Sequence, residues 1–198
     1  MTVHDIDPNF PVERWPEHWG HVKDRGALAF EAKYWSRTGE ILDMEVTFNY
    51  LQYDGKEYGC AILRDIGERK RAEAELRRSH TFLRQVIDTD PDLIFAKDRE
   101  GRFSVANKAV ADWYGTTVDD LIGKTDASFN PNADEVEFFR ENDLEVMNSG
   151  QDRFIPEEKF TDVNGTIRWL QTIKRPIYDD QGQVHMVLGA ATDITERK

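Results

Sequence analysis

The sequence uses cysteine once, at Cys60, in 198 residues. A single thiol cannot form an intramolecular disulfide or a multi-cysteine metal site, so we predict no metal centre and expect a reducing, cytoplasmic setting. No apolar run approaches the roughly 18 to 20 residues that span a bilayer. The first ten residues, MTVHDIDPNF, carry acids where a secretion signal needs a basic end and an apolar stretch. We therefore expect no direct insertion into a membrane.

Basic residues are also fewer than acidic residues. The chain has 26 Lys and Arg against 38 Asp and Glu, a formal net charge of −12. Nucleic-acid binding needs a broad basic face, so we expect no nucleic-acid partner. The basic cluster from Arg69 to Arg78 is interspersed with acids, which favours a solvated helix face. An apolar content of 39%, with five Trp and eleven Phe, indicates folded cores in one or two domains.

The sequence lacks the common catalytic motifs. It has no glycine-rich phosphate loop, no HExxH and no nucleophile elbow. The segment Ser79 to Arg84 faintly resembles the phosphoacceptor box of histidine kinases, but Thr81 stands where that box usually has an acid, and its proline is absent. We predict that His80 is a surface residue of a helix and that the chain is not an enzyme.

The most informative feature that is present is an internal repeat. The hexapeptide DIGERK at 65–70 recurs as DITERK at 193–198, an offset of 193 − 65 = 128 residues. Each copy closes a segment of β-rich runs separated by glycine-containing turns. Such segments are typical of antiparallel hairpins in a meander, so two domains are predicted to end alike.

A helix is predicted between the two copies, over residues 66–90. The segment is rich in Glu, Arg, Ala and Leu, and Asp90-Pro91 ends it. Its weak heptad seam predicts a coiled-coil linker; the seam consists of Arg69, Ala72, Leu76, Ser79, Leu83 and Val86.

The pattern after this helix predicts an α+β domain. A hairpin is expected over 93–106, and Asn107 and Thr117 can cap short helices that follow them. An amphipathic helix over 132–147 ends at Gly150, and three strands complete the segment.

These residues resemble the PAS family of sensory modules, with its C-terminal PAC motif. The resemblance rests on segments in a fixed order, among them Asp92 to Asp98, Asn107 to Gly115, Asp120 to Lys124 and Asp193 to Thr195. It implies a five-stranded antiparallel sheet of order 2-1-5-4-3 with helices on one face. Residues 91–195 would form a complete PAS domain, and 196–198 would begin an output linker. Residues 1–65 resemble only the C-terminal half of such a domain, with a helix expected before its first strand.

The resemblance also implies a cavity between the helices and the sheet. The residues it places there are Phe95, Val105, Val110, Trp113, Leu170, Val187, Gly189 and Ala191. The alternative is that these side chains simply fill a small core. A covalent flavin adduct is excluded because the second segment has no Cys, and Ala191 stands where the light-sensing branch has glutamine. Haem is disfavoured because 136–147 has no His. Non-covalent flavin or a small metabolite stays open.

In the PAS family the closing motif joins the last strand to an output helix. The resemblance therefore assigns signal transmission to Asp65, Glu68, Arg69, Asp193, Thr195, Glu196 and Arg197. We expect a non-catalytic sensory and dimerisation segment of a parent of the histidine kinase or diguanylate cyclase type, with an output domain after Lys198. The alternatives are an interaction scaffold without ligand and, less favoured, a flavin-binding redox sensor. The strand over 57–65 would lack one neighbour, so we expect a homodimer through the half-domain and linker helix.

Overall fold

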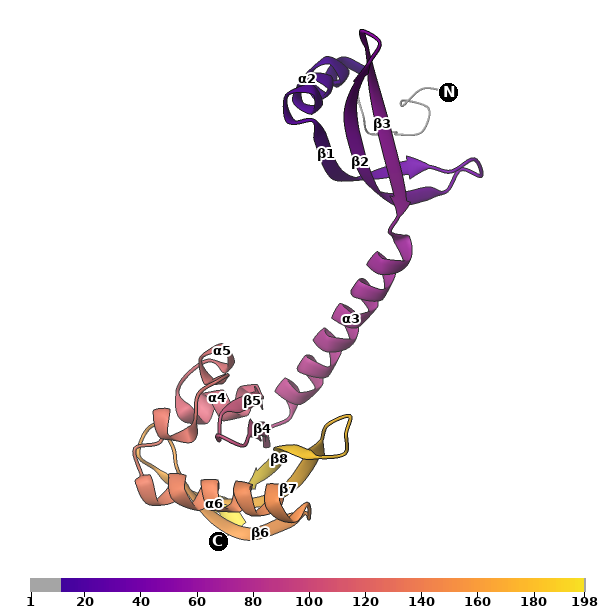
Figure 1. Ribbon diagram of the computed structural model, residues 1–198. Coiled ribbons are helices and arrows are strands. Elements are labelled where there is room, and N and C mark those ends of the chain that lie inside the picture. Colours follow the sequence, from indigo (N-terminus) through magenta and orange to yellow (C-terminus); the bar gives the residue numbers. More distant parts are fainter. Residues whose placement is uncertain (1–11, 198) are drawn as a thin grey trace. The chain divides into compact units, whose positions relative to one another are not determined.

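The computed structural model describes residues 12–197 and divides into two compact units, Met1–Ser79 and His80–Lys198, which are described separately. The first unit is a three-stranded antiparallel sheet of order β1-β2-β3 preceded by a helix (Figure 1). Its elements are η1 (Val12–Arg14), α2 (Trp15–Arg25), β1 (Ala27–Trp35), β2 (Ile41–Tyr53) and β3 (Lys56–Asp65). The helix expected before the first strand is therefore present from Trp15. Residues 1–11 lie outside the described residues.

The small core of the first unit lies between α2 and the inner face of β1 and β2. Val22 of α2 and Val46 of β2 are buried, and Phe48 is surrounded edge-on by the rings of Trp15, His18 and Trp19. Aromatic rings in such arrangements contribute beyond their buried area. The third strand does not share this burial, because β3 is exposed along its whole length.

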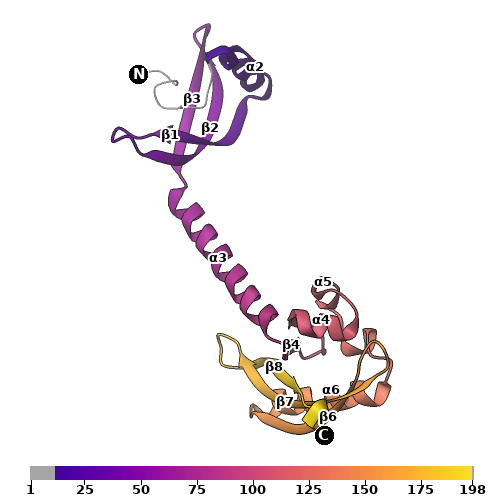
Figure 2. The ribbon, with the colours of Figure 1, turned by 180° about the vertical axis from the view of Figure 1, so that it is seen from behind.

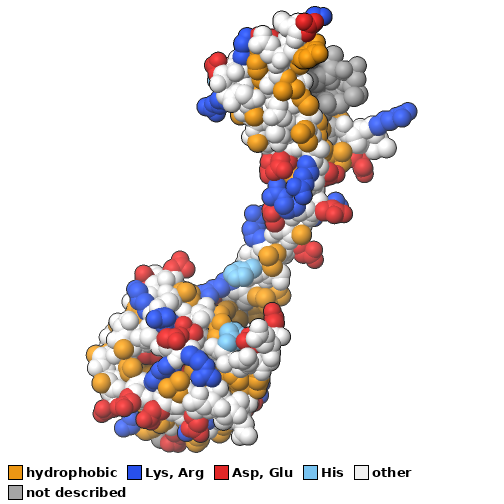
Figure 3. Space-filling model, in the orientation of Figure 1, with side chains coloured by type: hydrophobic (Ala, Val, Ile, Leu, Met, Phe, Trp, Pro, Cys, Tyr) orange, Lys and Arg blue, Asp and Glu red, His pale blue; other side chains and the backbone are white. Residues whose placement is uncertain are grey.

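Helix α3 (Gly67–Thr89) follows β3 and buries none of its residues. Its first turn is tied to the sheet of the first unit, because Arg69 contacts Glu31 of β1 and Lys70 contacts Asp43 of β2. Basic and acidic side chains are both present on the surface of the helix, as predicted for a solvated face (Figure 3). Within residues 12–197, no helix is both long enough and apolar enough to cross a bilayer.

The second unit is a five-stranded antiparallel sheet of order β5-β4-β8-β7-β6, which confirms the expected order 2-1-5-4-3. Figures 1 and 2 show its helices gathered on one face of the sheet. The elements are β4 (Leu93–Asp98), β5 (Phe103–Ala106), α4 (Lys108–Tyr114), α5 (Val118–Leu121), η2 (Asp126–Ser128), α6 (Ala133–Ser149), β6 (Arg153–Thr161), β7 (Ile167–Tyr178), β8 (Val184–Asp193) and η3 (Thr195–Arg197).

Asn107 holds three elements of the second unit together. Its side-chain oxygen caps α4 by accepting the Val110 N–H and also accepts the Ile94 N–H of β4. Its amide donates to the carbonyl of Ile87 in α3 at 2.9 Å. The side chain is fully buried, and each of these hydrogen bonds satisfies a backbone group near the end of a helix or strand. Asn107 thus fixes where α3 ends and the sheet begins.

The interior of the second unit forms two apolar clusters under the helices. The larger cluster joins β4, β5, α4 and α6 to the sheet and includes Phe103, Val110, Leu121 and Phe139. The smaller one packs Val146 and Met147 of α6 against β8. The larger cluster encloses the candidate site.

Candidate functional site

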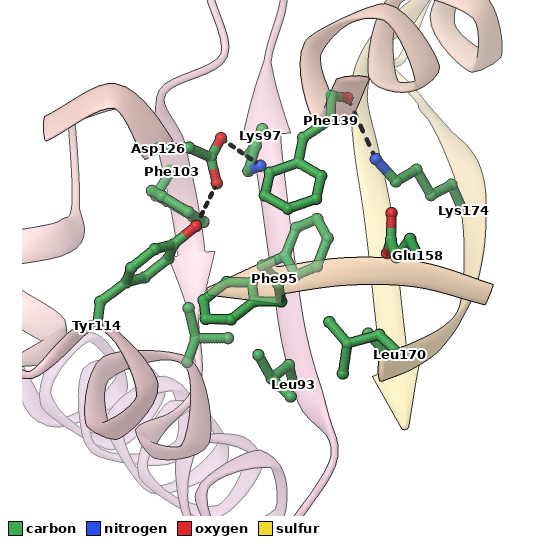
Figure 4. A pocket seen from close by; sticks show the side chains of 13 residues that line it. Leu93, Phe95, Lys97, Phe103, Tyr114, Asp126, Phe139, Glu158, Leu170 and Lys174 are labelled. Carbon is green, nitrogen blue, oxygen red and sulfur yellow. Dashed lines mark hydrogen bonds and ion pairs between the residues drawn. The ribbon is translucent and has the colours of Figure 1, made fainter. Parts of the chain in front are cut away.

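A cavity of about 30 Å³ lies between the helices and the sheet of the second unit. By this measure it has room for about two water molecules. Figure 4 shows it surrounded by the rings of Phe95, Phe103 and Phe139, with Leu93 and Leu170 on the sheet side. Five polar residues also line it, namely Lys97, Tyr114, Asp126, Glu158 and Lys174. The site is therefore an apolar pocket with ionisable groups on its wall.

Two buried lysines share two buried aspartates beside the cavity. The ammonium of Lys97 lies 2.6 Å from Asp126 and 3.5 Å from Asp143, and that of Lys174 lies 2.6 Å from Asp143. Lys174 also donates to the carbonyl of Phe139. Buried charges are tolerated when they are paired and hydrogen-bonded, and these four groups meet that condition. Asp143 is the centre of the network because it contacts both ammonium groups.

The Lys97 ammonium sits among aromatic rings. It lies 4.7 Å from the centroid of Phe95 and 4.8 Å from that of Phe103, distances typical of cation–π contacts. Burial by itself would lower the pKa of Lys97, but the carboxylates of Asp126 and Asp143 more than offset it and raise the pKa. The lysine is therefore held in its charged form.

Burial and neighbouring charges also act in opposite directions on the pKa of Asp143. Burial alone would raise the pKa of Asp143, but Lys97 and Lys174 lower it, so that it stays ionised. Tyr114 donates to Asp126 at 2.8 Å, and its pKa is raised well above the ordinary value by burial and by that carboxylate. Tyr114 is thus a neutral donor in the cavity wall.

Glu158 differs from the two aspartates. It is 5% exposed, and its Oε1 accepts a hydrogen bond from the Thr172 hydroxyl, while Oε2 has no hydrogen-bond partner among the described residues. Burial raises the pKa of Glu158, although Lys174 acts in the opposite direction. Figure 4 shows its carboxyl group between Lys174 and Leu170. An unsatisfied buried acceptor is costly, so this oxygen is where a bound donor would gain most.

Four of the eight residues predicted from the resemblance line the cavity: Phe95, Val110, Leu170 and Ala191. Gly189 does not open the expected space, because a Cβ at this position would lie 2.2 Å from the Phe95 ring that covers it. Val187 is buried against Val146 and Met147 of the smaller cluster. These placements correct two expectations about the cavity wall and leave ligand binding itself a prediction.

Val105 and Trp113 lie outside the cavity. Val105 pairs with Ala96, and the two neighbours of Ala96 on β4, Phe95 and Lys97, line the cavity; strand alternation therefore places Val105 on the other face of the sheet, where it is 38% exposed. Trp113 is half-buried, with its ring 5.3 Å from that of Phe160 and 4.9 Å from the Arg168 guanidinium. Trp113 therefore packs against the outer side of the larger apolar cluster and is partly exposed to solvent.

The charged residues that line the cavity, Lys97, Asp126, Glu158 and Lys174, were not predicted from the sequence. The period-two pattern could have revealed the two lysines, because Leu93, Phe95 and Lys97 alternate along β4 and all line the cavity. Leu170 and Lys174 lie on the same face of β7 for the same reason. Lysine and aspartate are usually exposed, so the pairing partners, 29 and 46 residues from Lys97, had no local signal.

The closing motif of the second unit forms a hydrogen-bonded joint at the end of β8. Asp193 accepts the backbone N–H of Thr195 at 2.9 Å, and its carboxylate lies 3.1 Å from the Arg168 guanidinium of β7. Trp169 is bonded on both sides, since its N–H donates to the Thr195 hydroxyl and its carbonyl accepts the Ile194 N–H. Two of the predicted transmission residues, Asp193 and Thr195, thus hold the joint. Glu196 and Arg197 are exposed in η3.

The first copy of the motif forms a related joint between β3 and α3. Asp65 accepts the Gly67 N–H at 2.7 Å, and Ile66 donates to the Asp43 carbonyl of β2. Arg69 forms its ion pairs with Glu31 and Glu73. Glu68 is exposed in the first turn of α3. Arg69, the basic residue of this motif, therefore forms an ion pair with β1.

An antiparallel sheet with helices over one face and a pocket beneath them is the architecture of a sensory-domain fold. The family model described as PAS fold matches residues 87–198, which is more than half of the chain, so the chain belongs to the PAS family. This family is one of sensory, non-catalytic domains.

Relatives of the chain include sensor proteins. The virulence sensor protein BvgS of Bordetella pertussis is 32% identical over 142 residues, covering 69% of this chain and 11% of that protein. The methanogenesis regulatory histidine kinase FilI of Methanothrix harundinacea is 31% identical over 124 residues, covering 63% and 14%. The solved PAS domain of Bordetella pertussis BvgS superimposes with a TM-score of 0.50 at 30% identity, covering 61% of this chain and 89% of that one. The chain thus spans a small part of the curated relatives' length.

Proposed function

We propose that the chain is a sensory and dimerisation segment of a signalling protein, in which the state of the cavity is passed to the joint at the end of β8. The parent would be of the histidine kinase or diguanylate cyclase type, with an output domain after Lys198. The mechanism is a population shift: a ligand or partner that favours one arrangement of sheet and joint biases the element that follows.

The observation that carries this proposal is the position of Leu170. Leu170 lines the cavity and is the ladder partner of Asp193, the acid of the joint. Ala191 also lines the cavity and lies two residues before Asp193 on β8. Trp169, the residue before Leu170, holds both Ile194 and Thr195. A displacement of the cavity wall therefore acts on the strands that carry the joint.

The test fills the cavity by mutation and follows the joint by amide hydrogen exchange. Ala191→Val adds two methyl groups at a site that is 1% exposed. We expect the Ile194 and Thr195 amides to exchange about threefold faster or more, because overpacking costs free energy that the adjacent joint absorbs. Ala190→Val is the matched control, since it makes the same change on the other face of β8. Equal effects of the two variants, or no effect of Ala191→Val, would contradict the coupling.

We further propose that a second copy of this chain covers the exposed strand β3 in a homodimer. The strand exposes Tyr58, Ile62 and Leu63. Among the described residues, β2 is the one strand that pairs with it. Proteins rarely leave an apolar edge strand uncovered. The chain continues from β3 into α3, where Leu76 is 72% exposed and Leu83 is 59% exposed. Two successive elements thus present apolar side chains that a like copy would match. An interaction scaffold without ligand would share this interface.

A pair of isoleucine variants tests the dimer interface. Ile62→Glu places a charge on exposed β3, and Ile41→Glu makes the same change on β2, where Ile41 is similarly exposed. In sedimentation experiments, we expect Ile62→Glu to shift the chain from dimer to monomer at tens of micromolar and Ile41→Glu to leave the dimer intact. A wild-type monomer, or equal behaviour of the two variants, would refute the interface.

A further inference from the structure

A surface groove of about 390 Å³ lies between the start of α6 and the edge strand β6. Four of its lining residues are acids, Asp134, Glu135, Glu157 and Glu158, against one lysine, Lys159, among the described residues. Phe138 and Trp169 add aromatic surface. A groove with this charge attracts cations and repels anions.

Glu158 lines both this groove and the interior cavity. The β6–β7 ladder shifts register between Ile155 and Glu158, and Glu158 resumes the pairing opposite Leu170, a cavity residue. A strand irregularity of this kind re-aims the side chain that follows it. Glu158 therefore stands at the wall that separates the groove from the cavity.

The charges around Glu158 leave it without a cation of its own. Among the described residues, the cavity wall and its ion-pair network contain two ammonium groups, Lys97 and Lys174, and three carboxyl groups, Asp126, Asp143 and Glu158, so 2 − 3 = −1 when all are ionised. Both ammonium groups lie within 2.6 Å of an aspartate. The buried Oε2 of Glu158 lacks a hydrogen-bond donor. The missing partner is a donor that also carries one positive charge.

We propose that the groove binds a small organic cation with a primary ammonium group. On binding, the Glu158 carboxyl group, whose Oε2 is closed to solvent in this structure, turns toward the groove and accepts the ammonium N–H, while the apolar body of the cation lies against Phe138 and Trp169. The inference deepens the proposed sensory function by naming the chemistry of the signal molecule. Binding supplies the cluster with its absent positive charge and satisfies the orphan acceptor. A neutral donor would satisfy the hydrogen bond alone, and an anion would meet three further carboxylates in the groove.

Protonation of Glu158 competes with the cation. The groups that face it are Thr172 and Lys174 from β7, Lys97 from β4 and Asp143 from α6. Because burial raises the pKa of Glu158, the carboxyl group takes up a proton more readily than an exposed glutamate. The affinity for the cation is therefore expected to fall as the pH is lowered through that pKa.

Three probes of matched shape test the charge class by calorimetric titration of the full chain: benzylammonium, benzyl alcohol and benzoate. We expect benzylammonium to bind about tenfold more tightly than benzyl alcohol, and benzoate not to bind, since a charge-assisted hydrogen bond is worth more than a neutral one. Equal binding of the alcohol and the ammonium overturns the proposal, and so does the absence of binding by benzylammonium at millimolar concentration.

Two variants test the position. Glu158→Gln removes the buried charge, and Glu157→Gln removes an exposed charge one residue away in the same groove. We expect Glu158→Gln to weaken benzylammonium binding about tenfold or more and Glu157→Gln to weaken it less than about threefold. Unchanged affinity in Glu158→Gln refutes the site, and a cooperative melt of that variant shows that it is folded. Neither result bears on the coupling of Ala191 to the joint, whose test uses no ligand.

Discussion

β3 of the first unit and β8 of the second unit leave their sheets through equivalent joints, yet their surroundings differ. In each, the isoleucine after the acid is buried and donates its N–H to the neighbouring strand, Ile66 to Asp43 and Ile194 to Trp169. β8 lies between β4 and β7, whereas β3 pairs with β2 alone among residues 12–197. At equivalent positions, 128 residues apart, Ala191 is 1% exposed and Leu63 is 41% exposed.

This difference shows what the front half of the fold contributes. In the second unit, β4, β5 and the helices cover the last strand, β8, which therefore forms part of the pocket wall. In the described part of the first unit, α2 covers part of the inner face of the same kind of meander. The joint depends on local sequence and forms in both, whereas the cavity depends on elements that are far away in the chain.

The largest expected difference concerns a carboxylate that serves two cations. Asp143 contacts Lys97 and Lys174 in the interior, and Glu31 contacts Arg69 and Lys70 at the surface. Asp143→Ala should lower the free energy of unfolding by about 3–5 kcal/mol, because two buried ammonium groups lose a partner. Glu31→Ala should have far less effect, because water solvates its partners. Urea denaturation measures both. Similar losses would show that burial does not set the strength of these ion pairs.

A smaller difference is expected at two glycines that lie under phenylalanine rings. A Cβ on Gly189 would approach the Phe95 ring to 2.2 Å, and a Cβ on Gly59 would approach the Phe48 ring to 2.2 Å. Gly189→Ala should cost about 1–3 kcal/mol, because β8 is held between β4 and β7 and cannot move away from the Phe95 ring. Gly59→Ala should cost less, because β3 pairs with β2 alone among residues 12–197 and its exposed backbone can shift away from the Phe48 ring. Thermal melts that rank the two variants in the opposite order would refute this difference in enclosure.

The smallest effect is a change in the pH dependence of stability. The pKa of Asp143 is below its ordinary 3.8, so its contribution is present above that value and is lost as the pH falls through the folded-state pKa. The pKa of Glu158 is above its ordinary 4.5, so stability decreases as the pH rises from that value through the folded-state pKa. Glu158→Gln should abolish the second decrease and keep the first. The exposed neighbour variant Glu157→Gln should retain both, and a wild-type profile in Glu158→Gln would contradict the assignment.

The parts of the structure that were predictable are those set by neighbouring residues. Asn107 and Thr117 cap the helices that follow them, as their side chains and spacing predicted. The strand order followed from the resemblance to the PAS family. The misplaced cavity residues depend on tertiary placement: Val105 pairs with Ala96 on the face of the sheet away from the cavity, and the Phe95 ring fills the space above Gly189. The buried pairs of Lys97 and Lys174 could not be predicted, because their partners come from distant helices.

Sedimentation of the full chain beside a fragment that begins at Ser79 tests the central claim, that the second unit is self-sufficient and the first needs a second copy. The fragment contains all five strands of the second sheet and the end of α3 that Asn107 holds. We predict a dimer for the full chain at tens of micromolar, and a monomer with a cooperative thermal transition for the fragment. A monomeric full chain, or a fragment that dimerises as well as the full chain, would contradict the claim.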